Sequence, residues 1–412
     1  MWEKPWKYKE SLVICAGFFT IGILLQLTIG KININLLAFP VNVGMLGIFA
    51  GILIYLNFTK SYFAKWLSSH YAAIPSMLAL AALIIVMGLT RQYPSETFVP
   101  GISGKLGIAQ MLSSWSFALL FMWFLTILGM VIFRRAKHFK IKKDIPFMLN
   151  HLGLFIALTA GILGSADMQR LEITTSLKKA EWRATDKLGN MVELPLAIEL
   201  NNFTIEEYPP KLMLVDNSTG KVLPDGAPEN ILLEDNVKSG TLLNWEITVI
   251  RHIEDAARVA NSDTVNYVAF NSPGSTYAVY VKAHNKITGK TNEGWVSCGS
   301  FLFPYKAIWL DDGCSLIMPD REPKRYASDI TVFRKDKDEV SGVVEVNKPL
   351  AVDEWKIYQV SYDEDKGKWS AISIFELVKD PWLPIVYTGI WMMIAGAIGM
   401  FMFAPKRKED KE

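Results

Sequence analysis

The sequence predicts a polytopic α-helical membrane protein with about six transmembrane helices and a large exported β-rich domain of sandwich-like type. Half of the 412 residues are apolar, and they gather in long runs. Between the last two runs lies a polar region in which apolar and polar residues alternate over short stretches. Long uncharged runs are typical of membrane helices, whereas alternation with a period of two is typical of β-strands.

Six runs contain no Asp, Glu, Lys or Arg and reach the roughly 20 residues that a helix needs to cross a bilayer. They are Ser11 to Gly30, Phe39 to Phe58, Tyr71 to Leu89, Trp115 to Phe133, Ile145 to Gly164 and Trp382 to Ala404. The first run follows three lysines, as a signal peptide would, but it is longer than a usual signal core and no A-x-A site ends it. We therefore expect an uncleaved first helix.

The flanking charges predict the orientation, because positive residues are retained on the cytoplasmic side. With the N-terminus inside, the inner segments carry Lys4, Lys7, Lys9, Lys60, Lys65, Arg134, Arg135, Lys137, Lys140, Lys142, Lys143, Lys406, Arg407, Lys408 and Lys411. The short outer loops carry Lys31, Arg91 and Lys105. Both termini are thus expected in the cytoplasm of a bacterial cell, with the large domain outside its cytoplasmic membrane.

Four parts follow from this topology. Residues 1–164 form a five-helix membrane region, 165–381 the exported β-rich domain, 382–404 the last transmembrane helix and 405–412 a basic cytoplasmic tail. Short links at 31–38 and 59–70 predict antiparallel neighbours in a bundle. The outer loop 90–114 contains proline and glycine and is expected to form a turn-rich cap, while the basic stretch 134–144 suits anionic membrane lipid.

The fifth helix contains His151, and an unpaired ionisable group inside a bilayer marks a candidate functional site. A neutral histidine bonded to a neighbouring helix is the alternative. Small residues at four-residue spacing predict a close-packing seam on this helix: Gly153, Ala157 and Gly161, with Ala160 and Gly164 near the same line. At about 100° per residue, His151 lies about 200° from Gly153 and so outside the seam. It is about 9 Å from the cytoplasmic end of the helix.

The exported region is acidic. Residues 166–381 hold 25 Lys and Arg against 34 Asp and Glu, a net charge of −9. Nucleic-acid binding needs clustered positive charge, so no nucleic-acid partner is expected. Attraction of a basic exported partner and simple solubility both remain open. Turn signals such as Asp225-Gly226, Ser272-Pro273-Gly274 and Asp312-Gly313 separate the alternating runs.

The cysteines and histidines limit the chemistry. Cys298 and Cys314 lie on the exported side, where a disulfide would close a loop of about 16 residues and contribute about 3 kcal/mol; a redox-active pair is the alternative, without CxxC spacing. Cys15 is expected to be a buried apolar residue. The other four histidines, His70, His138, His252 and His284, show no metal-ligand spacing, and no CxxCH, Walker or GxSxG motif occurs.

The last part of the polar region carries a distinctive series of motifs: Ser328-Asp329-Ile330, Val346-Asn347-Lys348-Pro349-Leu350, Tyr358-Gln359-Val360-Ser361-Tyr362-Asp363 and Asp380-Pro381 before the last helix. Together with the transmembrane His151-Leu152-Gly153-Leu154, this series resembles the ResB family, also called CcsB, of System II cytochrome c biogenesis proteins. The resemblance covers the chain from about Asp144 onward. VNKPL and YQVSYD are the specific elements. The family usually has three helices before its exported domain, whereas five are expected here.

The resemblance implies transport of haem b and its presentation, together with exported apocytochrome c, for attachment to CxxCH thiols. His151 matches the transmembrane histidine thought to ligate haem in transit, and the basic stretch 134–144 could contact haem propionates. The WWD segment of CcsA is absent, since no two tryptophans are adjacent. The chain would therefore be a half-site or non-catalytic subunit of a haem-lyase complex with a CcsA-like partner. A scaffold that does not bind haem and an exported thiol-handling protein are the alternatives.

Overall fold

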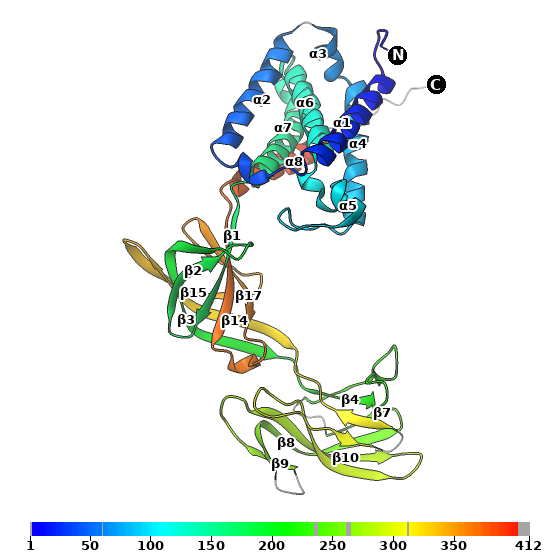
Figure 1. The fold of residues 1–412 in the computed structure, drawn as a ribbon, viewed down its shortest axis with the longest axis vertical. Coiled ribbons are helices and arrows are strands. Elements are labelled where there is room, and N and C mark those ends of the chain that lie inside the picture. Colours follow the sequence, from blue (N-terminus) through cyan, green and yellow to red (C-terminus); the bar gives the residue numbers. More distant parts are fainter. Residues whose placement is uncertain (1, 60, 235–237, 261–264, 311–312, 403–412) are drawn as a thin grey trace. The chain divides into compact units, whose positions relative to one another are not determined.

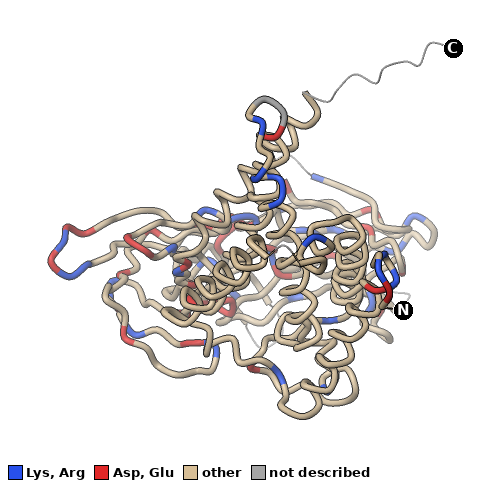
Figure 2. Tube along the Cα trace, turned by 90° about the horizontal axis from the view of Figure 1, so that it is seen from above, with Lys and Arg blue, Asp and Glu red and all other residues tan. Residues whose placement is uncertain are grey.

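The computed structural model describes residues 2–59, 61–234, 238–260, 265–310 and 313–402. The chain divides into two compact units (Figure 1). One contains residues 1–169 and 379–412, and the other contains residues 170–378. Charged residues are sparse along the long helices and frequent in the loops and along the strands (Figure 2). We describe each unit by itself.

The first unit is helical. Its helices are α1 (Tyr8–Thr28), η1 (Ile34–Leu37), α2 (Val41–Phe58), α3 (Tyr62–Leu67), α4 (His70–Leu89), α5 (Gly101–Lys105), η2 (Ile108–Ser113), α6 (Trp115–Ala136), α7 (Ile141–Gly164) and α8 (Leu383–Met402). Within the described residues, six of these helices are long and apolar enough to cross a membrane: α1, α2, α4, α6, α7 and α8. The predicted polytopic fold is therefore confirmed.

Three helices extend beyond the predicted apolar runs because charge does not end a helix at a membrane surface. The first begins at Tyr8 and includes Lys9 and Glu10, whose carboxylate accepts a hydrogen bond from the Lys7 amide at 2.7 Å. Helix α6 continues through Arg134 and Arg135, and α7 begins four residues early at Ile141. Several of the predicted inner basic residues, namely Lys60 and those of the tail 405–412, lie outside the described residues, as do 403 and 404.

Helices α7 and α8 pack backbone against backbone. A Cβ added at Gly153 would lie 2.5 Å from the Gly389 carbonyl oxygen, and one at Gly389 would lie 2.7 Å from the Ala157 amide. The space beside Gly164 is likewise filled by the Trp382 side chain. The predicted close-packing seam is therefore confirmed at these positions. The prediction that Gly161 belongs to the seam is wrong, since nothing lies within 4 Å of a Cβ placed there. Four-residue spacing drifts around the helix relative to a period of 3.6, which turns Gly161 away from α8.

Asp167, just after α7, joins three segments of the helical unit. Its carboxylate accepts hydrogen bonds from the Phe39 amide at 2.6 Å, from Asn42 Nδ2 at 2.7 Å and from Trp382 Nε1 at 2.6 Å. These donors belong to the start of α2 and to the residue before α8. Burial by itself raises the pKa of the Asp167 carboxyl, but the three hydrogen bonds outweigh it and hold the pKa below its usual value.

The second unit is β-rich. Its strands are β1 (Gln169–Ser176), β2 (Ala180–Thr185), β3 (Met191–Glu207), β4 (Lys211–Asp216), β5 (Val222–Leu223), β6 (Ile231–Leu232), β7 (Ser239–Leu242), β8 (Trp245–Ala260), β9 (Val265–Ala269), β10 (Thr276–Asn285), β11 (Thr291–Ser297), β12 (Ile308–Trp309), β13 (Cys314–Ile317), β14 (Pro323–Arg334), β15 (Lys337–Glu345), β16 (Leu350–Val352), β17 (Trp355–Tyr362) and β18 (Ile372–Lys379). A short helix, η3 (Gly367–Trp369), precedes β18.

Eight strands of the described chain form one curled sheet, in the order β15-β14-β3-β2-β1-β18-β17-β16. Its two edge strands, β15 and β16, follow one another in the chain and are joined by the turn 346–349, where Asn347 has a φ of 63°. A bridge between Glu345 and Lys348 ties the turn, and Gly342 of β15 packs directly on Leu350 of β16. The sheet thus nearly closes on itself, around a core that includes Ile198, Leu200, Ile330, Ile357 and Phe375.

The remaining strands form a sandwich. In the described residues, one sheet has the order β11-β10-β8-β7 with β9 beside β8, and the other has the order β12-β13-β4-β5 with β6 beside β4. Leu214 of β4 and Leu316 of β13 share one hydrophobic core with Ile247 of β8 and Val281 of β10. The predicted β-rich domain is confirmed. The alternation of the sequence did not distinguish the curled sheet from the sandwich, because both bury one face of each strand. The turn residue Asp312 lies outside the described residues.

Candidate functional site

His151 lies on α7, on the opposite side from α8. Gly153 and Asn150 meet α8, and Asn150 Nδ2 donates a hydrogen bond to the Met393 carbonyl at 3.2 Å. His151 Nδ1 lies 3.0 Å from the Phe147 carbonyl oxygen one turn earlier. A carbonyl can only accept, so Nδ1 carries the proton in this contact, and in the neutral imidazole Nε2 then keeps its lone pair. Among the described residues no hydrogen bond to Nε2 is recorded.

Aromatic rings line the same face of α7. The Phe147 ring stacks on the His151 ring with centroids 3.8 Å apart, and one turn further along the helix Phe155 stacks on Phe49 of α2 at 6.2 Å. The guanidinium of Arg135 lies 5.3 Å from the centroid of Phe147 and forms an ion pair with Asp144 in the first turn of α7. The His151 ring is therefore stacked on Phe147, and the Phe147 ring in turn has a cation beside it near the end of α6.

The motif residues of the β-rich unit form a buried polar network across the curled sheet. Ser328 Oγ of β14 donates to Gln359 Oε1 of β17 at 2.6 Å and lies 2.7 Å from Ser373 Oγ of β18. Gln359 Nε2 in turn donates to the Ser361 carbonyl at 2.9 Å, and Thr175 Oγ1 of β1 donates to the Ser373 carbonyl at 3.2 Å. Ser328, Ser373 and Thr175 are fully buried. The contacts of Ser328 join β14 to β17 and β18, which are not its neighbours in the sheet, whereas the Thr175 contact joins the neighbouring strands β1 and β18.

The other motif residues also have structural positions. Tyr362 packs its ring on Phe203 and Tyr326, with centroids 5.1 and 5.0 Å apart, and Asp363 forms an ion pair with Lys366 at 3.2 Å. Asp380 Oδ1 accepts hydrogen bonds from the Trp382 and Leu383 amides, both at 3.1 Å, at the start of α8. Asn347 and Pro349 lie in the turn that closes the sheet, Asp329 is exposed and Tyr358 is half-buried.

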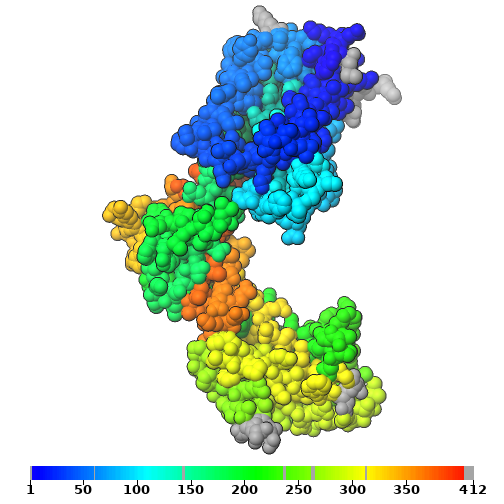
Figure 3. All heavy atoms as spheres, viewed as in Figure 1, coloured from blue at the N-terminus to red at the C-terminus, as the bar shows by residue number. Residues whose placement is uncertain are grey.

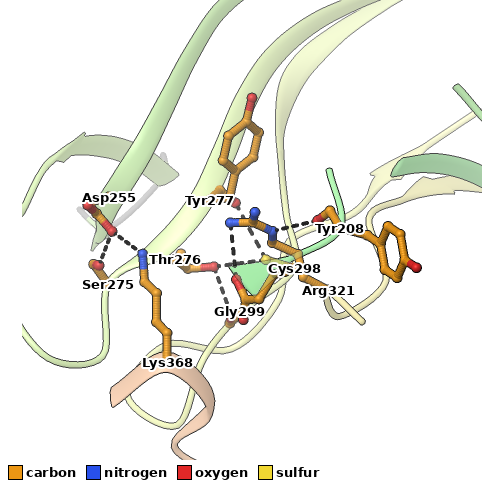
Figure 4. Close-up of polar contacts among 10 residues, drawn as sticks. Tyr208, Asp255, Ser275, Thr276, Tyr277, Cys298, Gly299, Arg321 and Lys368 are labelled. Carbon is orange, nitrogen blue, oxygen red and sulfur yellow. Dashed lines mark hydrogen bonds and ion pairs between the residues drawn. The ribbon is translucent and has the colours of Figure 1, made fainter. Parts of the chain in front are cut away.

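The β-rich unit contains a cavity of about 670 Å³. Its walls come from β8, β10, the segment after β11 and the η3 segment. Figure 3 shows the surface of the chain coloured along the sequence. Cys298 lines this cavity, with its Sγ 3.3 Å from Thr276 Oγ1, and Thr276 Oγ1 donates to the Gly299 carbonyl at 2.7 Å (Figure 4).

Two ion pairs brace the walls of the cavity (Figure 4). Lys368 Nζ donates to Asp255 Oδ1 at 2.6 Å, and Ser275 Oγ donates to the same oxygen at 2.8 Å. Arg321 pairs with Glu207 at 3.2 Å and also donates to the Tyr208 carbonyl. Burial by itself raises the pKa of the Asp255 carboxyl, but the hydrogen bonds from Lys368 and Ser275 outweigh burial and hold the pKa below its usual value.

The second cysteine, Cys314, is buried at the start of β13 and belongs to the sandwich core against which Cys298 also packs. The disulfide between them stays a prediction. Among the described residues, no three or more His, Cys, Asp or Glu side chains lie together in a way that could hold a metal ion. His151 would thus contribute a single ligand to any iron.

The fold and the motif network define a class of protein: a membrane protein in which a β-rich unit is inserted between two closely packed helices. A model of the ResB-like family matches residues 296–374 of the chain, from the end of β11 into β18. This segment is therefore ResB-like, as its motifs predict, and the match supports a role related to cytochrome c biogenesis. His151 and Asp380 lie outside the matched segment. No curated protein matches the chain.

Several residues of these sites were missed from the sequence. Ser373 and Thr175 complete the buried network, but isolated hydroxyl residues in a strand carry no distinguishing pattern. Gly389 and Gly396 on α8 face α7, and their seven-residue spacing in an apolar helix is a signal that would have identified them. Asp255 and Lys368 are 113 residues apart in sequence, so only the fold brings them together.

Proposed function

We propose that the chain is a ResB-like subunit of a membrane complex that transports haem and presents it, together with apocytochrome c, for covalent attachment. The observation that carries this proposal is the position of His151. It is a half-buried imidazole on an apolar helix, its Nδ1 is bonded to a backbone carbonyl, and its Nε2 has no hydrogen-bond partner among the described residues. Metal-ligating histidines are typically arranged in this way, because the second nitrogen fixes the tautomer and the ring.

The residues around His151 suit a haem that takes one of its two axial ligands from this chain. A neutral imidazole is a common haem ligand, and the stacked Phe147 ring and the apolar face of α7 suit a porphyrin edge. Arg135 Nε is buried without a hydrogen-bond partner among the described residues, so a donor remains for a propionate. When bound, haem would be the cargo of this chain. The chain itself would supply the His151 imidazole as a ligand, and the apolar face of α7 would keep water away from the bound haem.

The rest of the proposal concerns partners and orientation. The second ligand and the covalent chemistry would come from a CcsA-like subunit with a WWD segment, and the β-rich unit would serve as a chaperone or docking surface for apocytochrome c. Both termini would lie in the cytoplasm of a bacterium, with the β-rich unit outside the cytoplasmic membrane. Alkaline phosphatase fused within the β-rich unit should be active, and a fusion at the C-terminus should be inactive.

The test is haem content. The chain, purified together with a CcsA-like partner, should show a Soret band, and His151→Gly should lose most of it at unchanged protein yield. Added imidazole should restore the band to His151→Gly, because it replaces the missing ligand without repairing any packing. His70→Gly, at the exposed start of α4, is the matched control. Unchanged haem content and unchanged cytochrome c maturation in His151→Gly would contradict the ligand role.

Thiol handling is the second candidate function, and the position of Cys298 in the wall of the cavity favours it over a purely structural role for that residue. Exchange with apocytochrome thiols needs an accessible sulfur, and Cys298 is half-buried whereas Cys314 is buried. The Cys298→Ser/Cys314→Ser double variant should then lose cytochrome c maturation and regain it with an external reductant. Full maturation without reductant would exclude this function. A pure scaffold, in contrast, would contain no haem in any preparation.

A further inference from the structure

The cavity in the β-rich unit has an excess of negative charge. Among the described residues, three carboxylates that line it, Glu254, Asp320 and Asp365, make no recorded ion pair or side-chain hydrogen bond, and all three are exposed. Its three cations are already bound: Arg321 to Glu207, Lys366 to Asp363 and Lys368 to Asp255. A ligand that enters the cavity therefore meets unneutralised carboxylates, which favours a cation.

The same walls carry aromatic rings: Tyr277, Phe301, Phe303, Tyr305 and Trp369. Phe301 and Tyr305 are 41% and 67% exposed, so both rings are accessible to a ligand in the cavity. The indole nitrogen of Trp369 is buried without a hydrogen-bond partner in the described part of the chain. Rings beside carboxylates suit a ligand that is cationic at intervals and apolar between its charges.

The chain's own Lys368 shows how the cavity accommodates a lysine. Its ammonium group bonds to Asp255 at 2.6 Å and lies 5.1 Å from the ring centroid of Trp369, so it combines an ion pair with a cation–π contact. Glu254, next to Asp255 on β8, and Asp365, close to Trp369 in the chain, are further carboxylates in the lining of the cavity. An incoming lysine could therefore be held by the same chemistry.

We propose that this cavity binds a lysine-bearing, extended segment of an exported polypeptide, with Glu254, Asp320 and Asp365 pairing its ammonium groups and the aromatic rings contacting the residues between them. The volume of about 670 Å³ falls in the range of a few side chains. An anionic porphyrin is disfavoured here, because its propionates would meet the three carboxylates. The proposal rests on the proposed function only where it takes apocytochrome c as the natural partner.

The experiment uses the full chain in nanodiscs of phosphatidylcholine, a zwitterionic lipid that does not attract a cationic peptide, with empty nanodiscs as the blank. A fluorescein-labelled peptide of Lys-Ala-Phe repeats should raise its anisotropy on binding, and binding should weaken as salt rises from about 50 to about 500 mM. The peptide with Glu in place of Lys should not bind. The variant Glu254→Gln/Asp320→Asn/Asp365→Asn should bind the lysine peptide about tenfold more weakly or worse, since 1.4 kcal/mol already gives that factor.

The matched control is Glu172→Gln/Glu246→Gln/Glu339→Gln, which makes the same change of net charge at exposed positions away from the cavity. Equal loss in both triple variants would mean that net charge alone attracts the peptide and would overturn the proposal. A second measurement needs no variant: a lysine peptide with a photoreactive benzoylphenylalanine should cross-link to the cavity walls, and cross-links elsewhere would overturn it. Haem loading through His151 does not enter either readout, so the two proposals fail separately.

Discussion

The two units specify their packing in opposite ways. Between α7 and α8 the contact is made by glycines, with Gly153 and Gly389 facing each other's backbones, and Asn150 adds a side-chain hydrogen bond. Inside the curled sheet, apolar side chains fill the core and a buried network of hydroxyls crosses it. Lipid is as apolar as leucine, so membrane helices rely on close approach, whereas in water burial drives folding and polar groups fix which strands pair.

The largest expected effect on stability comes from disturbing the glycine contact between α7 and α8. Gly153→Ala places a Cβ against the Gly389 carbonyl and must separate α7 from α8, at a cost of about 1–3 kcal/mol or more. Gly161→Ala on the same helix meets open space and should leave stability unchanged or slightly higher. Thermal unfolding of the two detergent-solubilised variants measures the difference. Equal melting temperatures would mean that the glycine contact does not hold α7 to α8.

The next largest effect on stability is expected in the buried hydroxyl network of the β-rich unit. Ser328→Ala leaves Gln359 and Ser373 without a shared partner in a fully buried position and should cost about 1–3 kcal/mol. Ser341→Ala removes a hydroxyl from the exposed Thr331–Ser341 contact and should change the free energy of unfolding by less than about 0.5 kcal/mol. Urea unfolding followed by circular dichroism compares them. A Ser328→Ala variant as stable as Ser341→Ala would show that the network has no role in stability.

A smaller effect tests whether the helical unit also uses polar contacts. Asp167→Asn exchanges a charged acceptor of three hydrogen bonds for a neutral amide and should cost about 1–2 kcal/mol at neutral pH. The folded pKa is lowered, so the carboxylate stabilises the protein above the unfolded pKa of about 3.9, and this stabilisation disappears as pH falls through the folded pKa. The wild-type advantage over Asp167→Asn should therefore shrink in thermal unfolding at acid pH. A constant difference would contradict this role.

The smallest expected effect concerns the wall of the cavity. Lys368→Met removes the ion pair with Asp255 but keeps an apolar stem over Trp369, and the partly exposed pair should contribute about 1 kcal/mol or less. The Asp255 pKa should rise toward its usual value in the variant, which NMR titration of the carboxyl can measure. Lys282→Met, which breaks the exposed Lys282–Glu293 pair at 3.3 Å, serves as the control. An unshifted Asp255 titration would exclude Lys368 as the cause.

The sequence predicted the six apolar helices and the β-rich domain because their signals are local: run length in one case and alternation in the other. It placed His151 away from the seam by helical geometry, but it wrongly counted Gly161 as a member of the seam. It identified Ser328 and Gln359 as parts of a motif without their roles. Those roles depend on Ser373 and Thr175, which come from strands distant in sequence, and no local pattern contains that information.

The cavity could not be predicted for the same reason. Its walls come from segments around Asp255, Cys298 and Lys368, which only tertiary packing brings together. The acidity of the whole region was visible in its composition, but the composition does not show which carboxylates lack a partner. Only the ion pairs of the folded chain show which carboxylates lack a partner. Those unpaired carboxylates decide whether the acidity of the region serves solubility or the recognition of a ligand.

The hydrogen bond between Asp167 and Trp382 has a consequence for how this architecture could evolve. It joins the point where the chain leaves the helical unit to the point where it returns, and β1 and β18, the first and last strands of the β-rich unit, are neighbours in one sheet. Each unit therefore has its two connecting ends side by side, which is the condition under which one domain can be inserted into another without disturbing either fold. The β-rich unit can thus be exchanged for another domain of the same spacing while the six helices retain their packing.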